Sequence, residues 1–202
     1  MNAHVKIAVL LSTYNGEKFL AEQLDSLLAQ SHTNFILVVR DDGSKDRTVS
    51  ILESYASAHS ERIRLLPRDC ENLGASAGFA FLVDYVLKNK DPLGLQSAYM
   101  MFCDQDDTWY PQKIEKLLAA MLATQAGNDS ALPVLVHSDL EVVSEQNTVI
   151  AKSLISYQGL EIHRNSFPNL IISNLVTGCT ALINESLAEK ALPIPENAIM
   201  HD

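Results

Sequence analysis

Carboxylates crowd one short stretch of this sequence. Asp104, Asp106 and Asp107 lie within four positions directly after an apolar run, and Asp41 and Asp42 follow an earlier run. Because neighbouring carboxylates repel one another at neutral pH, crowding them gains nothing unless a positive partner is present. Oxygen donors without thiolates or paired imidazoles favour Mg²⁺ or Mn²⁺, whose shell is completed by water and substrate phosphates. The sequence therefore predicts a divalent cation that carries a phosphate.

Short apolar runs predict the strands that position these acids. The runs lack the polar alternation of a half-exposed strand, so they indicate strands buried on both faces of a sheet. They occupy residues 7–11, 35–39, 63–66, 98–103 and 134–136. After residue 140 the pattern weakens to a hairpin or loop region that extends to about 165, and a further strand is expected at 176–183.

Helical periodicity separates the apolar runs. Apolar residues recur on one helical face over 19–28, 79–87 and 114–122. Proline is favoured at the first position of a helix, and Pro111 is expected to begin the third of these. Strands that alternate with helices predict βαβ crossovers. The fold class is therefore α/β, with a mostly parallel, Rossmann-like sheet flanked by helices.

Polar segments follow three of the predicted strands. They are residues 12–17, 40–48 and 103–107, and each lies where a strand is expected to end. Open α/β sheets bind their ligands in the crevice outside the carboxyl ends of the strands. We therefore expect the aspartates of the second and third segments to converge on one crevice.

Composition narrows the possible functions. The 202 residues, of which 47% are hydrophobic and 20% charged, suit one α/β domain. A net charge of −10 without a block of Lys or Arg argues against direct binding of nucleic acid. No apolar run approaches the ~20 residues of a membrane helix, so no transmembrane segment is expected. Cys70, Cys103 and Cys179 lie far apart, which favours buried free thiols in a reducing compartment. We expect a cytoplasmic protein, peripheral to the inner membrane face.

Several motifs, in order and spacing, resemble one enzyme family. The strings are "LLSTYNGEKFLAEQLDSLLAQS" (10–31), "LVVRDDGSKDRT" (37–48), "NLGASAGFA" (72–80), "CDQDDTWYPQKI" (103–114), "NLVTGCTALIN" (174–184) and the terminal "HD" (201–202). Together they resemble the family 2 glycosyltransferases of the GT-A fold, and most of all the bacterial rhamnosyltransferase-like branch. The resemblance covers essentially the whole chain.

The resemblance implies a domain organisation. It predicts a single GT-A (nucleotide-diphospho-sugar transferase) domain over residues 1–202, with a nucleotide-sugar-binding half at 1–110 and an acceptor-side half at 111–202. The chain is expected to be truncated at its C-terminus, because relatives continue into a further segment that covers the acceptor site.

The resemblance also implies a donor site. Thr13, Tyr14 and Glu17 match the first loop, which in the family lies against the nucleoside of the donor. Asp41 matches the aspartate that hydrogen-bonds the pyrimidine. Asn72, in the third of the quoted strings, is carried over as a further donor-binding residue.

The catalytic elements are carried over in the same way. Asp42 follows Asp41 on the donor side, at the turn made by a glycine. Asp104 and Asp106 match the DxD motif, in which Asp104 reaches the ribose or the metal and Asp106 coordinates the metal on the pyrophosphate. Asp202 matches the acidic residue that serves as the catalytic base in inverting members.

These assignments predict a reaction. The resemblance implies metal-dependent, inverting transfer of a sugar from a UDP- or dTDP-sugar to a hydroxyl of a glycan or glycolipid acceptor, in bacterial surface polysaccharide synthesis. A metal offsets the charge that develops on the leaving phosphate, and a carboxylate on the acceptor side removes the hydroxyl proton. The sequence has no recognisable Ser–His–Asp or Cys–His constellation, and this reaction needs none.

Two alternatives come from other functional classes. The string "DQDDT" (104–108) also fits the DxDxT motif of haloacid dehalogenase-like phosphatases, in which Asp104 would accept a phosphoryl group. That motif normally follows the first strand, whereas here at least three strands are expected before it. The other alternative is a non-catalytic fragment that binds a nucleotide sugar but does not transfer it.

Overall fold

The computed structural model describes residues 4–68, 72–128, 131–172 and 174–195. Cys70 and Asp202, which the sequence analysis singled out, lie outside these ranges.

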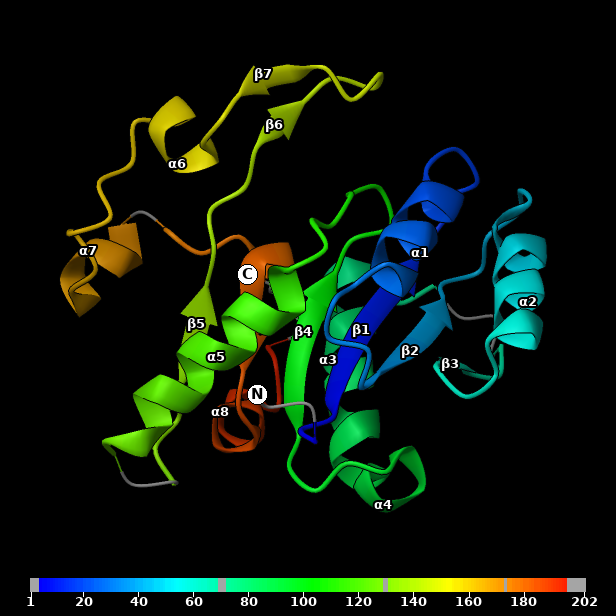
Figure 1. Cartoon of the computed structure of the whole chain (residues 1–202), viewed down its shortest axis with the longest axis horizontal. Helices are drawn as coiled ribbons and strands as arrows, with labels where there is room; N and C mark the ends of the chain where they lie inside the picture. The colour runs from blue at the N-terminus through cyan, green and yellow to red at the C-terminus, as the bar shows by residue number, and fades with distance from the viewer. Residues whose placement is uncertain (1–3, 69–71, 129–130, 173, 196–202) are drawn as a thin grey trace.

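A six-stranded sheet forms the centre of the molecule (Figure 1). Its strand order is β3-β2-β1-β4-β8-β5, and β1 to β4 run parallel while β8 is antiparallel to both of its neighbours. The bounds are β1 Ile7–Thr13, β2 Phe35–Asp41, β3 Ile63–Leu65, β4 Tyr99–Cys103, β5 Leu135–His137 and β8 Ala181–Ile183. The mostly parallel sheet predicted from the apolar runs is confirmed.

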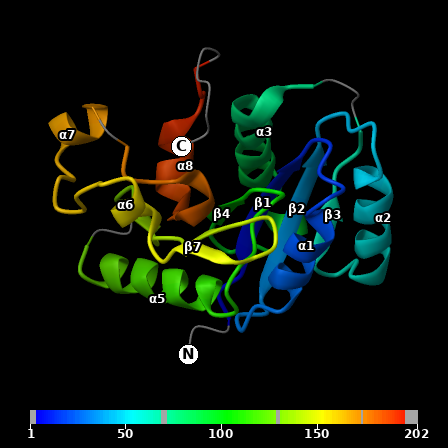
Figure 2. The same ribbon diagram turned by 90° about the horizontal axis from the view of Figure 1, so that it is seen from above.

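Helices cover both faces of the sheet (Figure 2). On one face lie α1 (Leu20–Leu28), α2 (Thr48–Ala58) and α5 (Lys113–Ala126). On the other lie α3 (Gly74–Lys88), α4 (Lys90–Leu93) and α8 (Glu185–Ala191). Each face has its own apolar core, because successive residues of a strand point to opposite sides.

Strand β1 contributes side chains to both cores. Val9 and Leu11 pack with the helices of the first face, and Ala8 and Leu10 pack with those of the second. All four are fully buried. The predicted burial on both faces is therefore confirmed for this strand, as it is for β2.

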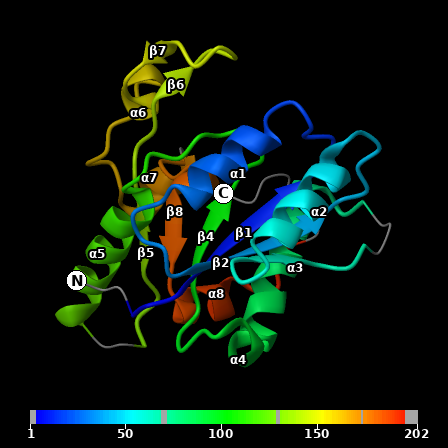
Figure 3. The same cartoon turned by 45° about the vertical axis from the view of Figure 1, so that its right-hand side comes forward.

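The segment after β5 is built differently. It contains the β6–β7 hairpin (Val142–Val143 and Val149–Ala151), α6 (Leu154–Tyr157) and α7 (Phe167–Ile172). In Figure 1 and Figure 3 the hairpin and α6 stand apart from the central sheet, above it in both views. The hairpin or loop region predicted after residue 140 is confirmed. Among the described residues, no helix has the length and apolar character that crossing a membrane requires.

Four local predictions were wrong. The run at 63–66 forms an edge strand, so Arg64 is exposed instead of buried. The run at 134–136 forms an edge strand with one neighbour, so Leu135 is 40% exposed instead of buried. The strand expected at 176–183 begins only at Ala181, because 178–180 form a short 3-10 helix. Pro111 precedes α5 instead of beginning it. Its carbonyl accepts a hydrogen bond from Ser31 N–H, which ties it to the segment after α1.

Candidate active site

Three loops meet at the carboxyl ends of adjacent parallel strands. The first loop (14–19) follows β1, the second (42–47) follows β2 and the third (104–112) follows β4. Strand β1 lies between the other two, with Thr13 opposite Asp41 and Leu11 opposite Cys103. The sheet therefore brings together the three polar segments that the sequence placed at strand ends.

Hydrogen bonds join the first loop to the second. Backbone N–H groups of the first loop donate to side chains of the second loop and to Thr48, which lies in the first turn of α2. The bonds run from Asn15 N to Ser44 Oγ (2.9 Å), from Gly16 N to Thr48 Oγ1 (2.8 Å) and from Glu17 N to Asp46 Oδ2 (3.1 Å). In return, Arg47 N and Nε donate to the Glu17 carboxylate. The two loops form one hydrogen-bonded unit.

Asp41 lies at the base of this unit and is 5% exposed. Its Oδ1 accepts hydrogen bonds from Thr13 Oγ1 (3.1 Å) and Ser44 Oγ (2.5 Å). Its Oδ2 accepts from the backbone N–H groups of Gly43 (3.2 Å) and Ser44 (3.0 Å). The carboxylate faces the neighbouring loop, and a ligand N–H that binds it must replace or share one of these bonds.

Asp42 is held by a buried ion pair. Its Oδ1 accepts a bond from Arg40, and the two side chains are 2–3% exposed. The same carboxylate accepts from Leu73 N and Gly74 N (2.8 Å each), where α3 begins. A carboxylate at a helix N-terminus is favoured by the orphan N–H groups and by the helix dipole. Asp42 therefore anchors α3 to the second strand.

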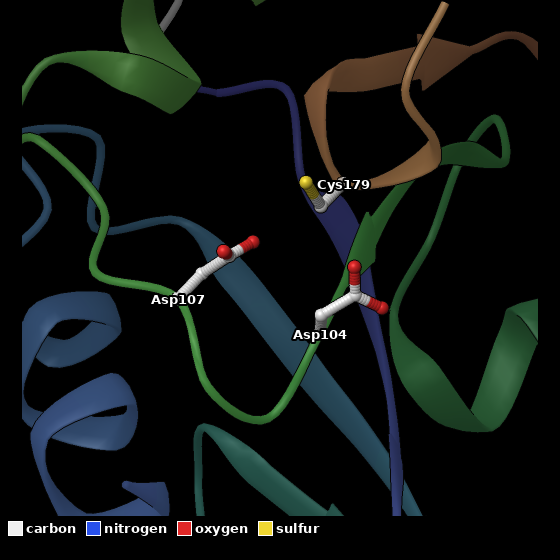
Figure 4. A group of neighbouring side chains, drawn as sticks. All are labelled: Asp104, Asp107 and Cys179. Carbon is white, nitrogen blue, oxygen red and sulfur yellow. The ribbon is translucent and has the colours of Figure 1, made fainter. Parts of the chain in front are cut away.

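Asp104, Asp107 and Cys179 form a second polar cluster. One ligand atom of each lies within 4.8 Å of the others, and Figure 4 shows the two carboxylates on the third loop with the thiol approaching from the neighbouring segment. Asp104 and Asp107 are half-buried, whereas Asp106 is exposed and lies outside the cluster. At this spacing, both carboxylates could hold one cation. Two carboxylates plus water and substrate phosphates match the usual Mg²⁺ shell.

A lysine borders this cluster. Lys113 Nζ donates to the carbonyl of Cys179 (2.7 Å) and lies 3.8 Å from the centre of the Trp109 ring. Burial lowers the pKa of the Lys113 ammonium, and the negative charges of the nearby aspartates act in the opposite direction. Burial also raises the pKa of the Cys179 thiol, which keeps it protonated near neutral pH. Cys103 and Cys179 are free and buried, as the sequence predicted.

The remaining predicted donor-site residues lie around the first two loops. Thr13 is buried against Asp41, while the Tyr14 side chain is 46% exposed. Glu17 is bonded to Arg47, and Asn72 Nδ2 donates to the carbonyl of Asp42 (2.9 Å). The structure thus brings the predicted donor residues to one edge of the sheet.

Sequence reasoning missed several members of the site. Arg40 carried a signal, because a lone arginine inside an apolar strand requires a buried partner. Lys113 and the Cys179 thiol gave no comparable signal, since their places depend on α5 and on the segment before β8. Gln105 stands at the middle position of the DxD motif, where the motif specifies no residue and therefore predicts no role.

Comparison with known proteins identifies the family. The family model described as "Glycosyl transferase family 2" matches residues 8–189. An uncharacterized glycosyltransferase of Rickettsia typhi is 26% identical over 91% of this chain and 52% of its own length. The dTDP-rhamnosyl transferase RfbG of Shigella flexneri is 33% identical over 57% of this chain and 38% of its own length. The chain thus spans about half, or less, of the length of these relatives.

Solved structures share the fold. The mannosyltransferase PcManGT of Pyrobaculum calidifontis, solved with GDP-Man and Mn²⁺, matches 95% of this chain and 48% of its own with a TM-score of 0.61 at 17% identity. Residues 1–349 of Staphylococcus aureus TarS, solved with UDP, match 95% of this chain and 51% of their own with a TM-score of 0.57 at 19% identity. These likenesses confirm the GT-A fold. Because the family model matches residues 8–189, which are most of this chain, the chain belongs to glycosyl transferase family 2.

Proposed function

We propose that this chain binds a nucleoside diphosphate sugar across its three loops and takes part in transfer of the sugar, with inversion, to an acceptor hydroxyl. The first and second loops bind the nucleoside. The third loop binds the pyrophosphate through a divalent cation. The donor is a UDP- or dTDP-sugar, and the acceptor is a glycan or glycolipid.

The observation that carries this proposal is the meeting of Asp104 and Asp107 at the edge of the sheet that also bears the first two loops. A pyrophosphate would be repelled by these carboxylates alone, so a cation must lie between them. Asp104 belongs to the cluster and to the DxD motif alike. For the second carboxylate, the motif assigns Asp106, whereas the spacing favours Asp107.

A bound Mg²⁺ or Mn²⁺ supplies a Lewis acid that offsets the charge developing on the leaving phosphate. The protein's own groups do the rest. Asp104 and its partner carboxylate would hold the cation that binds the pyrophosphate end of the donor, and the hydrogen-bonded first and second loops would fix the nucleoside end. On the acceptor side a carboxylate removes the hydroxyl proton. Resemblance to the family assigns that base to Asp202.

Named relatives support a role in surface polysaccharide synthesis. TuaG of Bacillus subtilis, named as a teichuronic acid biosynthesis glycosyltransferase, is 27% identical over 92% of this chain and 79% of its own length. RfbG is named as a dTDP-rhamnosyl transferase. We propose that this chain serves the same class of pathway. The phosphatase alternative loses its support, because the chain belongs to family 2 and the motif follows β4.

Ligand-induced stabilisation tests the donor site. The thermal transition of the chain is measured with UDP, dTDP and GDP, each with Mn²⁺ and each with EDTA. We expect UDP or dTDP to raise the transition temperature only with Mn²⁺, because a ligand that binds the native state stabilises it according to its affinity. Equal stabilisation in EDTA would contradict the metal-bridged donor site.

Transfer itself is tested at Asp202. A base contributes in the transition state and hardly at all to donor binding. We therefore expect Asp202→Asn to keep metal-dependent binding of the nucleotide sugar while transfer falls by ~10²-fold or more. If the unsubstituted protein binds the nucleotide sugar but does not transfer the sugar, the non-catalytic alternative is favoured. Transfer at the parental rate by the asparagine variant would move the base to another residue.

A further inference from the structure

Gln105 lies between the two aspartates of the DxD motif, and its side chain reaches the first loop. Tyr14 N–H donates to Gln105 Oε1 (2.9 Å), and Gln105 Nε2 donates to the Tyr14 carbonyl (3.0 Å). The two residues are 91 positions apart in the sequence. One amide therefore satisfies both backbone groups of a single residue on another loop.

The chemistry of this contact requires an amide. Tyr14 presents one donor and one acceptor, and only a side chain with one acceptor and one donor at matching spacing satisfies both. Glutamate offers two acceptors, and methionine of similar length offers neither hydrogen bond. The pairing also fixes the orientation of the amide, because the flipped form would set donor against donor and acceptor against acceptor.

Gly16 makes room for the amide. A Cβ built at Gly16 would lie 2.2 Å from Gln105 Oε1 and 2.7 Å from its Cδ, far inside van der Waals contact. Gly16 N–H meanwhile donates to Thr48 Oγ1, which holds the glycine in the unit formed by the first two loops. The Gln105 amide thus packs directly on the loop to which it is bonded.

The contact between Gln105 and Tyr14 lies beyond the last paired residues of β1 and β4, and this position makes it important. Register pairing between β1 and β4 ends at Leu11 and Cys103, so the two loops beyond are no longer spaced by ladder hydrogen bonds. In the proposed function the first loop contacts the nucleoside and the third loop holds the cation on the pyrophosphate. A donor must reach both at once.

We propose that Gln105 is a positioning residue that sets the distance between the nucleoside-binding loop and the carboxylates of the third loop. It acts through Tyr14 and Gly16 and needs no contact with the donor. The inference rests on the proposed function. It predicts that Gln105 strengthens the coupling between cation and nucleotide, since a fixed spacing removes the ordering cost of binding across two loops.

The test uses Gln105→Met, which keeps the length of the side chain and loses both hydrogen bonds, and Gly16→Ala, which displaces the amide from the other side. Gln112→Met is the matched control, because Gln112 is exposed and its side chain does not cap α5. Calorimetric titration with uridine, with UDP in EDTA and with UDP at saturating Mn²⁺ is run on each chain. Thermal melts establish that each variant is folded.

We expect Gln105→Met to weaken UDP binding in Mn²⁺ by about tenfold, the order of the cost when binding itself must order the two loops. Uridine, which spans only the first two loops, should bind as to the parent. The factor by which Mn²⁺ increases UDP affinity should therefore shrink in this variant and in Gly16→Ala. The double variant should be no weaker than the weaker single variant, because both break one contact.

Failure of the positioning role and failure of the proposed function give different results. If the parent binds UDP with Mn²⁺ and Gln105→Met shows the same increase on adding Mn²⁺, the positioning role is overturned and the donor site stands. An equal loss for uridine and for UDP would mean a structural role alone and would also overturn it. If the parent binds neither UDP nor dTDP in Mn²⁺, the proposed function fails and this inference fails with it.

Discussion

The two groups of aspartates at this edge of the sheet have the same chemistry and different surroundings. Asp41 and Asp42 are 5% and 2% exposed, and their oxygens accept hydrogen bonds from a buried arginine, from hydroxyls and from backbone N–H groups. Asp104 and Asp107 are half-buried, and their oxygens face each other and a protonated thiol. The first pair is neutralised by the protein, and we propose that the second is completed by a cation from solution.

Under the proposed function, this difference separates structural carboxylates from ligand-binding ones. A buried charge with its partner removed costs several kcal/mol, so Asp42 must remain paired for the fold to hold. Half-exposed carboxylates that repel one another cost the apo protein stability and recover it when a cation binds. Mutations in the two groups should therefore affect different quantities.

The largest effect is expected at Asp42. Asp42→Ala removes the carboxylate of a buried ion pair with Arg40 and the acceptor of two N–H groups at the start of α3. We expect a loss of about 3–5 kcal/mol in the free energy of unfolding, measured by urea denaturation. Asp106→Ala, on the exposed part of the third loop, is the control and should change it by less than about 0.5 kcal/mol. Equal stability of the two variants would remove the distinction between the groups.

The next effect is expected in binding at the third loop. Asp104→Asn should abolish the Mn²⁺-dependent part of UDP binding, a loss of tenfold or more, roughly 1.4 kcal/mol at least. The stability of the apo protein should stay equal or rise, because repulsion is relieved. Titrations of Asp106→Asn and Asp107→Asn then identify the second ligand. The motif predicts the larger loss at Asp106, and the cluster geometry predicts it at Asp107.

A smaller effect is expected at Asp41, which belongs to the structural group and is proposed to read the base. Uracil and thymine carry an imide N–H that cytosine lacks. Asp41→Ala should therefore reduce the preference for UDP over CDP by about 1–3 kcal/mol, the range for a hydrogen bond to a charged group. Competition binding with the two nucleotides measures it. Full preference in the variant would mean that Asp41, like Asp42, serves the fold alone.

The smallest effect concerns a carboxylate outside both groups. Burial alone would raise the pKa of Glu185, but hydrogen bonds from Lys90 and Ala98 N–H lower it below its usual 4.5. A lowered folded pKa contributes stability that is present above pH 4.5 and is lost as the pH falls through the folded value. Replacing this carboxylate by Glu185→Gln should lower the free energy of unfolding by about 1 kcal/mol at pH 7 and by less at pH 3. Urea denaturation at both pH values measures the difference. A cost independent of pH would assign it to packing.

The local pattern of apolar and polar residues in the sequence predicted much of the site. The continuous apolar runs predicted β1, β2 and β4, and polar residues directly after them had to lie at one edge of a parallel sheet. The prediction failed where tertiary context decides the outcome. Leu135 is exposed because its strand is at the edge of the sheet, and the carbonyl of Pro111 is bonded to Ser31 in the segment after α1. Neither feature leaves a mark in the local sequence.

By itself, the sequence determined the α/β class, the central parallel strands β1, β2 and β4, the three polar loops and the family, because apolar period and motif order are properties of the chain. Only the tertiary structure decided what each acid does there. Asp42 meets the start of α3, Asp107 meets Cys179 from the segment before β8, and Gln105 meets Tyr14 91 positions away. These contacts join residues far apart in the chain, and their distances depend on how strands and helices pack. Whether a carboxylate is neutralised by the protein or by a cation depends on those distances.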